Sequence, residues 1–138
     1  MVFVLDRLTK SLVMANVPFG TEFPAVDHVI WITNIHNAGA AFGAIPAGAT
    51  FFLVASVAVA IGLVVYVARN PGGLLTDAVL GLIMGGTVGN GYDRIMFGSV
   101  TDFIALHFWP VFNAADSAIS VGVVALIAGY LIRKPAGA

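Results

Sequence analysis

Two aspartates, Asp102 and Asp116, are the residues in this sequence whose types and positions best suit them to chemistry. Asp102 lies in a short connection between apolar stretches, and Asp116 lies one turn into the last of these stretches. We expect the two carboxyl groups to meet at a membrane boundary, where burial and mutual repulsion raise one pKa and let the pair share a proton. The ionised carboxylate could then take a proton from water while its protonated neighbour hydrogen-bonds a peptide carbonyl. This chemistry is amide hydrolysis of the aspartic-protease type.

A purely structural interpretation of both aspartates stays open at this level. A carboxylate in the first turn of a helix is favoured by the helix dipole, which could account for Asp116. Asp102 could simply form an ion pair with Arg94. Neither of these interpretations requires catalysis.

Three asparagines and one arginine could assist the two aspartates: Asn37, Asn90, Asn113 and Arg94. An amide both donates and accepts hydrogen bonds, which suits it to orient carboxylates and a substrate backbone where little water is present. As isolated residues, the asparagines could equally be helix caps or turn residues. Arg94 could bind a substrate carbonyl or an internal carboxylate such as Asp93.

Charged residues near the N-terminus predict structural support rather than reaction chemistry. Asp6 and Lys10 are spaced i and i+4, which makes them a natural pair on one helix face. Together with Arg7 they would be costly in lipid, so we expect all three to find partners inside a helix bundle.

Other chemistries find little support in the sequence. Without cysteine the chain has no disulfide, thiol nucleophile or Cys-ligated zinc. His28, His36 and His107 do not fall at the spacing of a zinc-binding H-E-x-x-H helix, and no serine stands in a nucleophile elbow. We therefore expect neither a metal nor a cofactor. The formal net charge of -1 lacks the basic excess that nucleic-acid binding needs.

The elements that must position these residues are apolar helices. Of the 138 residues 59% are hydrophobic and only 9% are charged, with a mean hydropathy of +0.99, which is typical of an integral membrane protein. Glycines at 81, 85 and 89 share one helix face and predict close helix packing. We predict one membrane domain over residues 1–138, an all-α bundle of four transmembrane helices at residues 2–18, 50–68, 74–91 and 114–132.

A segment of different character, residues 19–47, separates the first two predicted spans. It combines Pro, Gly, Asn and His with short β-branched runs, so we expect a small β-rich element outside the lipid. Residues 11–68 contain no Lys or Arg, whereas Arg69 and the pair at 133–134 follow later spans. By the positive-inside rule those cations are cytoplasmic, so residues 19–47 and the connection at 89–113 face outward.

Five blocks of these residues, in this order along the chain, resemble the motifs of bacterial lipoprotein signal peptidase, also called signal peptidase II. The blocks are Asp6–Lys10 (DRLTK), Asn37–Gly43 (NAGAAFG), Gly89–Arg94 (GNGYDR), Val100–Phe103 (VTDF) and Phe112–Asp116 (FNAAD). The last three are specific in combination, and the resemblance extends over nearly the whole chain.

The resemblance implies that Asp102 and Asp116 form the catalytic pair of an aspartic endopeptidase, with structural support from Asp6, Lys10 and Asp93. The substrate site would be lined by Asn37, Asn90, Arg94 and Asn113. The implied partners are membrane lipid and prolipoproteins whose lipobox cysteine carries diacylglyceryl, cut on the amino side of that cysteine. The implied location is the bacterial cytoplasmic (inner) membrane, with the site near its outer face. We expect a monomer.

One departure from the family concerns the first predicted helix. Family members carry a longer apolar run before the first block, whereas only residues 1–5 precede it here. Residues 2–17 give about 24 Å of helix against a bilayer core of about 30 Å, so the first helix is expected to be truncated at its cytoplasmic end. An alternative is a non-catalytic protein of the same fold that binds lipidated or signal-peptide helices. A small transporter would instead place paired charges deep within its spans.

Overall fold

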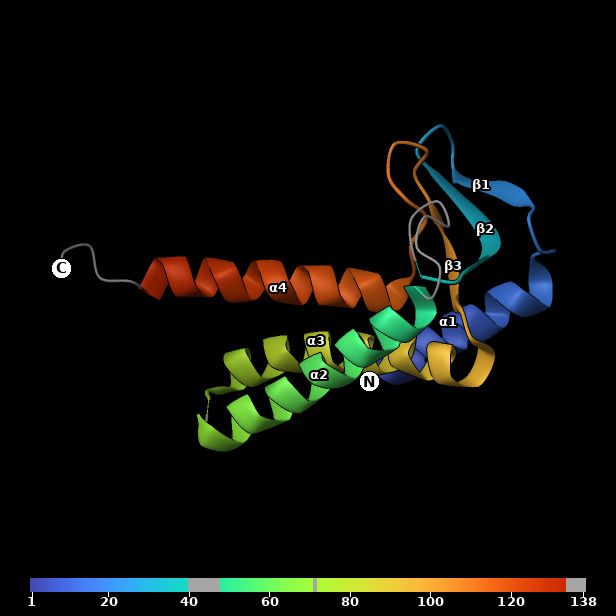
Figure 1. The fold of residues 1–138 in the computed structure, drawn as a ribbon. Coiled ribbons are helices and arrows are strands. Elements are labelled where there is room, and N and C mark those ends of the chain that lie inside the picture. The colour runs from blue at the N-terminus through green and yellow to red at the C-terminus, as the bar shows by residue number, and fades with distance from the viewer. Residues whose placement is uncertain (40–47, 71, 134–138) are drawn as a thin grey trace.

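A computed structural model describes residues 1–39, 48–70 and 72–133. These residues form four helices and a three-stranded sheet that lies at one end of the helices (Figure 1). The helices are α1 (Val2–Asn16), α2 (Gly48–Arg69), α3 (Leu74–Phe97) and α4 (Ala114–Arg133). The strands are β1 (Glu22–Val26), β2 (Ile30–Asn37) and β3 (Val100–Ala105).

Helix α3 is the central element, since α1, α2 and α4 all pack against it. Small residues allow this close approach. A Cβ at Gly85 would lie 2.6 Å from the Cβ of Val2, and one at Gly89 would lie 2.7 Å from a carboxylate oxygen of Asp6. The predicted glycine face is therefore confirmed at these two positions. It is not used at Gly81, where a Cβ would meet no described atom within 4 Å.

The sheet is antiparallel, in the order β1-β2-β3, and corrects the prediction for residues 89–113. That stretch is not a simple connection. Helix α3 continues through it to Phe97, where Gly98 ends the helix in the left-handed conformation with φ +72°, and β3 follows. Strand β3 is rich in β-branched and aromatic residues, and its backbone groups are satisfied by pairing with β2. Asp102 thus lies on a strand, opposite Ile35.

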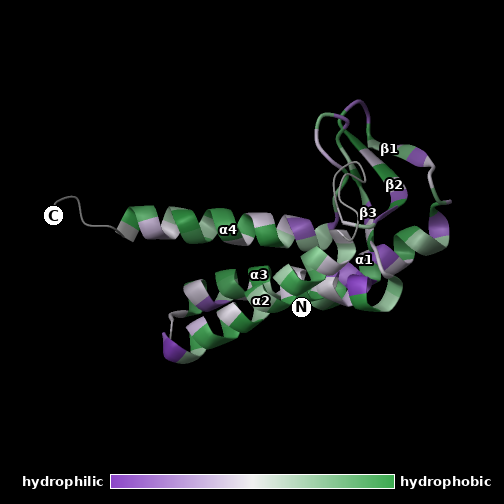
Figure 2. Cartoon of the chain, viewed as in Figure 1, coloured by the Kyte–Doolittle hydropathy of each residue, from purple (hydrophilic) through white to green (hydrophobic). Residues whose placement is uncertain are grey.

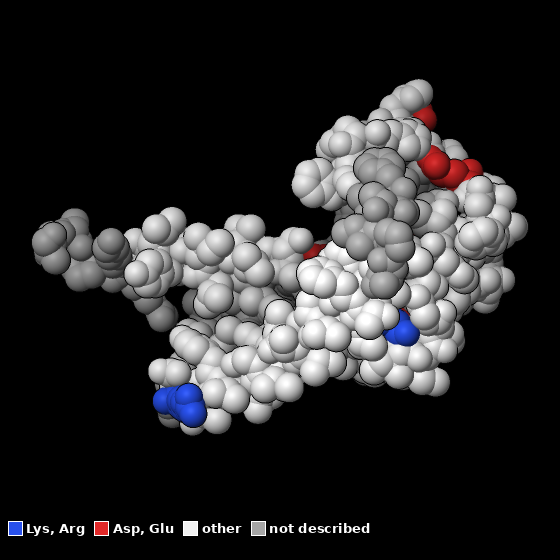
Figure 3. Space-filling view, in the orientation of Figure 1, with Lys and Arg blue, Asp and Glu red and all other residues white. Residues whose placement is uncertain are grey.

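The outer surfaces of the helices are apolar. Within the described ranges, α2 and residues Ala114–Ile132 of α4 are long and apolar enough to cross a membrane. Hydrophobic residues cover much of all four helices, and the helix surface in the space-filling view carries few charged groups (Figures 2 and 3). None of the residues in the apolar window of α2 is buried within the chain, so this helix needs another apolar environment around it.

The interior, in contrast, is polar where α1, α3 and α4 meet. The largest fully buried side chains are Lys10, Asn113, Asp6 and Asp93. Buried polar groups are tolerated only when they are hydrogen-bonded or paired, so this region must form a connected network.

Candidate active site

Asp102 occupies a buried position at the junction of β3 with β2. Only 2% of its surface is exposed. Asn37 donates to one carboxylate oxygen at 3.0 Å, and Asn113 donates to the other at 2.6 Å. Burial raises the pKa of the Asp102 carboxyl to about 6, and the amide donors partly oppose that shift. Asp102 therefore loses its proton at a higher pH than an ordinary aspartate does.

Asp116 lies in the first turn of α4 and is held there by Asn113. The Oδ1 of Asn113 accepts a hydrogen bond from the backbone N–H of Asp116 at 3.0 Å. In return, the backbone N–H of Asn113 donates to Oδ2 of Asp116 at 3.2 Å. This reciprocal pair is a capping box, which satisfies two backbone donors at the helix start. Asp116 is therefore a helix N-terminal residue, as its structural interpretation predicted.

The same capping arrangement brings the two aspartates together. Asn113 contacts the carboxylates of both Asp102 and Asp116. Asn90 donates from Nδ2 to Oδ1 of Asp116 at 2.7 Å and accepts at Oδ1 from Nδ2 of Asn113 at 3.1 Å. The two aspartates and the three predicted asparagines thus form one connected cluster. Helix capping and participation in the cluster are compatible roles for Asp116.

In the part of the chain that the structure describes, Arg94 does not form the ion pairs with Asp93 or Asp102 that the sequence suggested. Its guanidinium lies 5.3 Å from the ring centroid of Phe52 on α2, and Nη1 donates weakly to the carbonyl of Asn90 at 3.4 Å. Among the described residues it forms no ion pair with Asp93 or Asp102. Adjacent residues of a helix point in different directions, so Asp93 cannot share its neighbour's face.

Asp93 instead belongs to a buried charge cluster between α1 and α3. It pairs with Arg7 and with Lys10, the latter at 2.8 Å, and Lys10 also pairs with Asp6 at 2.8 Å. The expectation that these N-terminal charges find partners inside the bundle is confirmed. The sequence did not identify Arg7 as the partner of Asp93; their i and i+86 separation gives no local signal.

Asp6 extends this cluster to the start of α4. Its Oδ1 accepts the backbone N–H of Ala115 at 3.0 Å, so the residue that pairs with Lys10 also binds the first turn of the helix that carries Asp116. Asp6 and Lys10 therefore contact Ala115 and Asn90, which are respectively beside Asp116 in the chain and hydrogen-bonded to it.

Comparisons with known proteins agree with this arrangement. The sequence profile of the family described as Signal peptidase (SPase) II matches residues 1–132. The chain belongs to the signal peptidase II family. The lipoprotein signal peptidase of Halothermothrix orenii is 39% identical over 126 residues, covering 91% of this chain and 87% of that relative. The lipoprotein signal peptidase of Bacillus subtilis is 39% identical over 137 residues, covering 96% and 89%.

Solved structures extend the similarity of this signal peptidase II family member to three dimensions. A bacterial membrane enzyme determined by the in meso method at 2.3 Å matches with a TM-score of 0.88 and 30% identity, covering 99% of this chain and 88% of that one. A second such structure, at 1.9 Å, has the same TM-score and identity. The resemblance found in the motifs is confirmed: the chain is a protease and a membrane protein.

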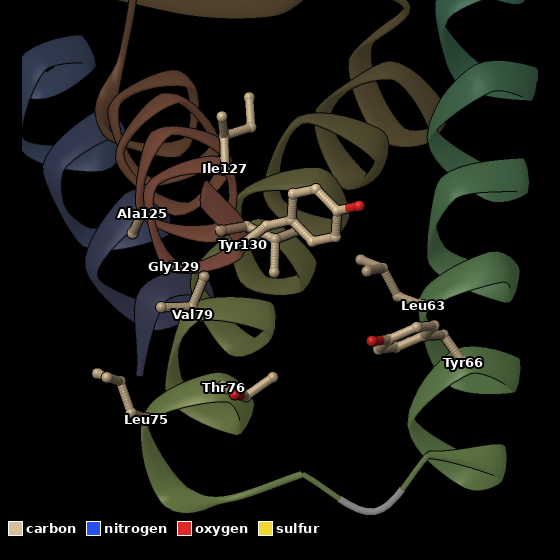
Figure 4. A pocket seen from close by; sticks show the side chains of 10 residues that line it. Leu63, Tyr66, Leu75, Thr76, Val79, Ala125, Ile127, Gly129 and Tyr130 are labelled. Carbon is tan, nitrogen blue, oxygen red and sulfur yellow. The ribbon is translucent and has the colours of Figure 1, made fainter. Parts of the chain in front are cut away.

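An apolar pocket of about 670 Å³ lies between α2, α3 and α4, away from the aspartate cluster. Tyr130 of α4 points toward Leu63 and Tyr66 of α2 across it, and Ile127 of α4 and Val79 of α3 also line it (Figure 4). None of the clustered aspartates and asparagines lines it. The pocket is therefore suited to an apolar group rather than to reaction chemistry.

Proposed function

We propose that this family member is an aspartic endopeptidase that removes signal peptides from diacylglyceryl-modified prolipoproteins, with Asp102 and Asp116 as its catalytic pair. The observation that carries the proposal is the contact of Asn113 with both carboxylates, which joins an aspartate of β3 to an aspartate of α4. The names of the relatives support the substrate class.

In this mechanism the pair holds one proton. The ionised carboxylate accepts a proton from a water molecule, which attacks the scissile carbonyl, while the protonated carboxyl donates a hydrogen bond to the carbonyl oxygen. The raised pKa of Asp102, about 6, favours a proton held by the pair at mildly acidic pH, well above the pH at which an ordinary aspartate is protonated. Asn37, Asn90 and Asn113 orient the pair, and Arg94 lies beside it to bind the substrate backbone.

We further propose that α1 and α3 cross the membrane with α2 and α4, as one domain in the bacterial inner membrane. Arg69, at the end of α2 remote from the sheet, marks the cytoplasmic side. The sheet and the aspartate cluster then lie at the outer face. The part of the predicted outer segment at residues 40–47 lies outside the described residues, as does Lys134 of the predicted cytoplasmic cations.

The apolar pocket fits the substrate's signal peptide. Helices α3 and α4 both run from the aspartate cluster to the pocket, and Ala125 at its edge lies about 14 Å along α4 from Asp116. A signal peptide has an apolar region of about 7 to 15 residues close to its cleavage site. With the scissile bond at the aspartates, that region would lie beside the pocket.

The test is a gel-shift cleavage assay on a diacylglyceryl-modified prolipoprotein in detergent or lipid. Asp102→Asn and Asp116→Asn should each abolish cleavage while retaining fold and substrate binding. Asp27→Asn, on a carboxylate that is 84% exposed at the sheet, is the matched control and should cleave like the parent. Substrate binding without cleavage by the folded parent would instead indicate a binding protein of the same fold.

A further inference from the structure

Lys10 is the one cation in the described residues that contacts both the buried charge cluster and the amides around the aspartates. Its side chain is fully buried. The ammonium lies 2.8 Å from an oxygen of Asp6, 2.8 Å from one of Asp93 and 2.9 Å from Oδ1 of Asn90. An ammonium group has three hydrogens and no acceptor, so each hydrogen has its own partner. Charge neutralisation accounts for two of these contacts, but not for the third.

The third contact fixes the direction of a hydrogen-bond chain. Because Lys10 can only donate, Asn90 must turn its oxygen toward Lys10 and its NH₂ group toward Asp116, 2.7 Å away. The opposite amide orientation would place NH₂ hydrogens against the ammonium and an oxygen against a carboxylate. The positive charge of Lys10 also polarises the amide and strengthens its donation to Asp116.

Charges within the buried cluster are balanced without the catalytic pair. Arg7 and Lys10 offset Asp6 and Asp93. The negative charge of the pair is stabilised by the attraction of Lys10, which acts on both aspartates, and by groups that face its own carboxylates. Around Asp116 these are the polarised amide of Asn90, the start of α4 with its dipole, and the nearby charge of Arg94.

Asp102 has weaker support for a negative charge. Its two donors are neutral side-chain amides, neither of which takes a hydrogen bond from Lys10, and its surface is 2% exposed. Asp116 is half-buried, so water can reach it more easily. Burial and donor chemistry thus both favour the proton on Asp102 and the charge on Asp116.

Resting on the proposed aspartic mechanism, we propose that Lys10 is a positioning residue that acts through Asn90 to keep Asp116 ionised as the water-activating base, while Asp102 holds the proton. Lys10 does not contact the reacting atoms in this arrangement. Its effect on catalysis is transmitted by the orientation and polarisation of one amide.

The test compares two double variants that each remove one cation and one anion from the same cluster. Asp6→Asn/Lys10→Met breaks the contact with Asn90, whereas Arg7→Met/Asp93→Asn leaves it in place. The first variant should lower kcat roughly 100-fold with KM nearly unchanged, and should move the acidic limb of the kcat/KM profile to higher pH by about one unit. The second should lose thermal stability but retain the parent's pH profile.

Single variants cover the case in which the first double variant does not fold. Lys10→Arg keeps a cationic donor and Lys10→Gln keeps only a neutral one, so only the glutamine variant should move the acidic limb. If the acidic limb of the kcat/KM profile lay at the same pH in both single variants, or at the same pH in both double variants, the proposed role of Lys10 would be overturned. Cleavage that survives in Asp102→Asn or Asp116→Asn would instead overturn the proposed dyad, which distinguishes the two failures.

Discussion

At the scale of single residues, Asn113 combines two roles that sequence motifs treat separately. Its Oδ1 and backbone N–H complete the capping box with Asp116, while its Nδ2 donates to Asp102 and to Asn90. One side chain therefore starts α4 and connects the two aspartates. Substitutions that preserve one role and remove the other can separate them.

Replacing Asn113 by Ser or Ala makes that separation. Serine caps helices about as well as asparagine but cannot reach Asp102 or Asn90 with an amide, so Asn113→Ser should lose at least about 100-fold in kcat and about 1 to 3 kcal/mol of stability from the lost amide contacts. Asn113→Ala should lose activity to the same extent and about 1 kcal/mol more stability than the serine variant, because it also loses the cap. Thermal unfolding and the cleavage assay measure the two effects; parent-like activity of the serine variant would show that capping alone matters.

The buried carboxyl of Asp102 predicts a pH dependence of stability. Its folded pKa of about 6 exceeds the usual 3.8, so the folded protein binds this proton more tightly than the unfolded chain does. The contribution of Asp102 to the unfolding free energy should therefore be greatest below about pH 4 and fall by about 2 to 3 kcal/mol as the pH rises through 6. Asp102→Asn should flatten this slope, whereas Asp27→Asn should retain it. A parent without the slope would contradict the raised pKa.

At the scale of elements, the glycines of α3 show that their spacing predicts a packing face but does not predict which of them another helix contacts. Gly81, Gly85 and Gly89 follow one spacing, yet only the last two lie under side chains of α1. The periodicity of the glycines predicted the face. The position of α1 decided at which of them a side chain would prevent close packing.

These glycines make a matched set of substitutions. Gly85→Ala and Gly89→Ala should each lower stability by about 1 to 3 kcal/mol, because the added methyl group overlaps Val2 or Asp6. Gly81→Ala meets no described atom within 4 Å and should be neutral or stabilise α3 by up to about 1 kcal/mol. Thermal unfolding in one detergent compares all three. Equal losses at the three positions would contradict the packing described for α1.

At the scale of the whole molecule, polar and apolar regions are reversed relative to a soluble domain. Charges and amides fill the interior where α1, α3 and α4 meet. Many large apolar side chains of the helices are exposed, and most residues along the helices are hydrophobic (Figure 2). This distribution suits a site that must hold ionised groups beside lipid. It also leaves the apolar pocket away from the aspartate cluster, toward the other end of the bundle.

Filling that pocket should affect substrate binding but not the reaction. Ala125→Trp should raise KM about tenfold and leave kcat near the parent value, because an apolar signal segment loses its contact surface. Leu12→Trp, on an exposed site of α1, adds the same bulk elsewhere and should leave both constants unchanged. Equal KM values in the two variants would show that the signal peptide does not use the pocket.

The sequence, with its resemblance to a known family, determined the membrane class, the approximate positions of the helices and the residues that gather around Asp102 and Asp116. These follow from local composition, from hydrophobic run length and from motifs in which neighbours in the chain stay neighbours in space. Helix α3 beyond residue 91 and strand β3 were missed because Asp93, Arg94 and Asp102 made that stretch look like an exposed connection.

Only the tertiary structure decided which charges meet. It paired Asp93 with Arg7 and Lys10 rather than with Arg94, placed β3 beside β2, and turned Asn90 between Lys10 and Asp116. Such contacts depend on which faces of separate helices touch. Residues that are far apart along the chain give no local signal of such a contact, because the contact forms only when the helices pack together.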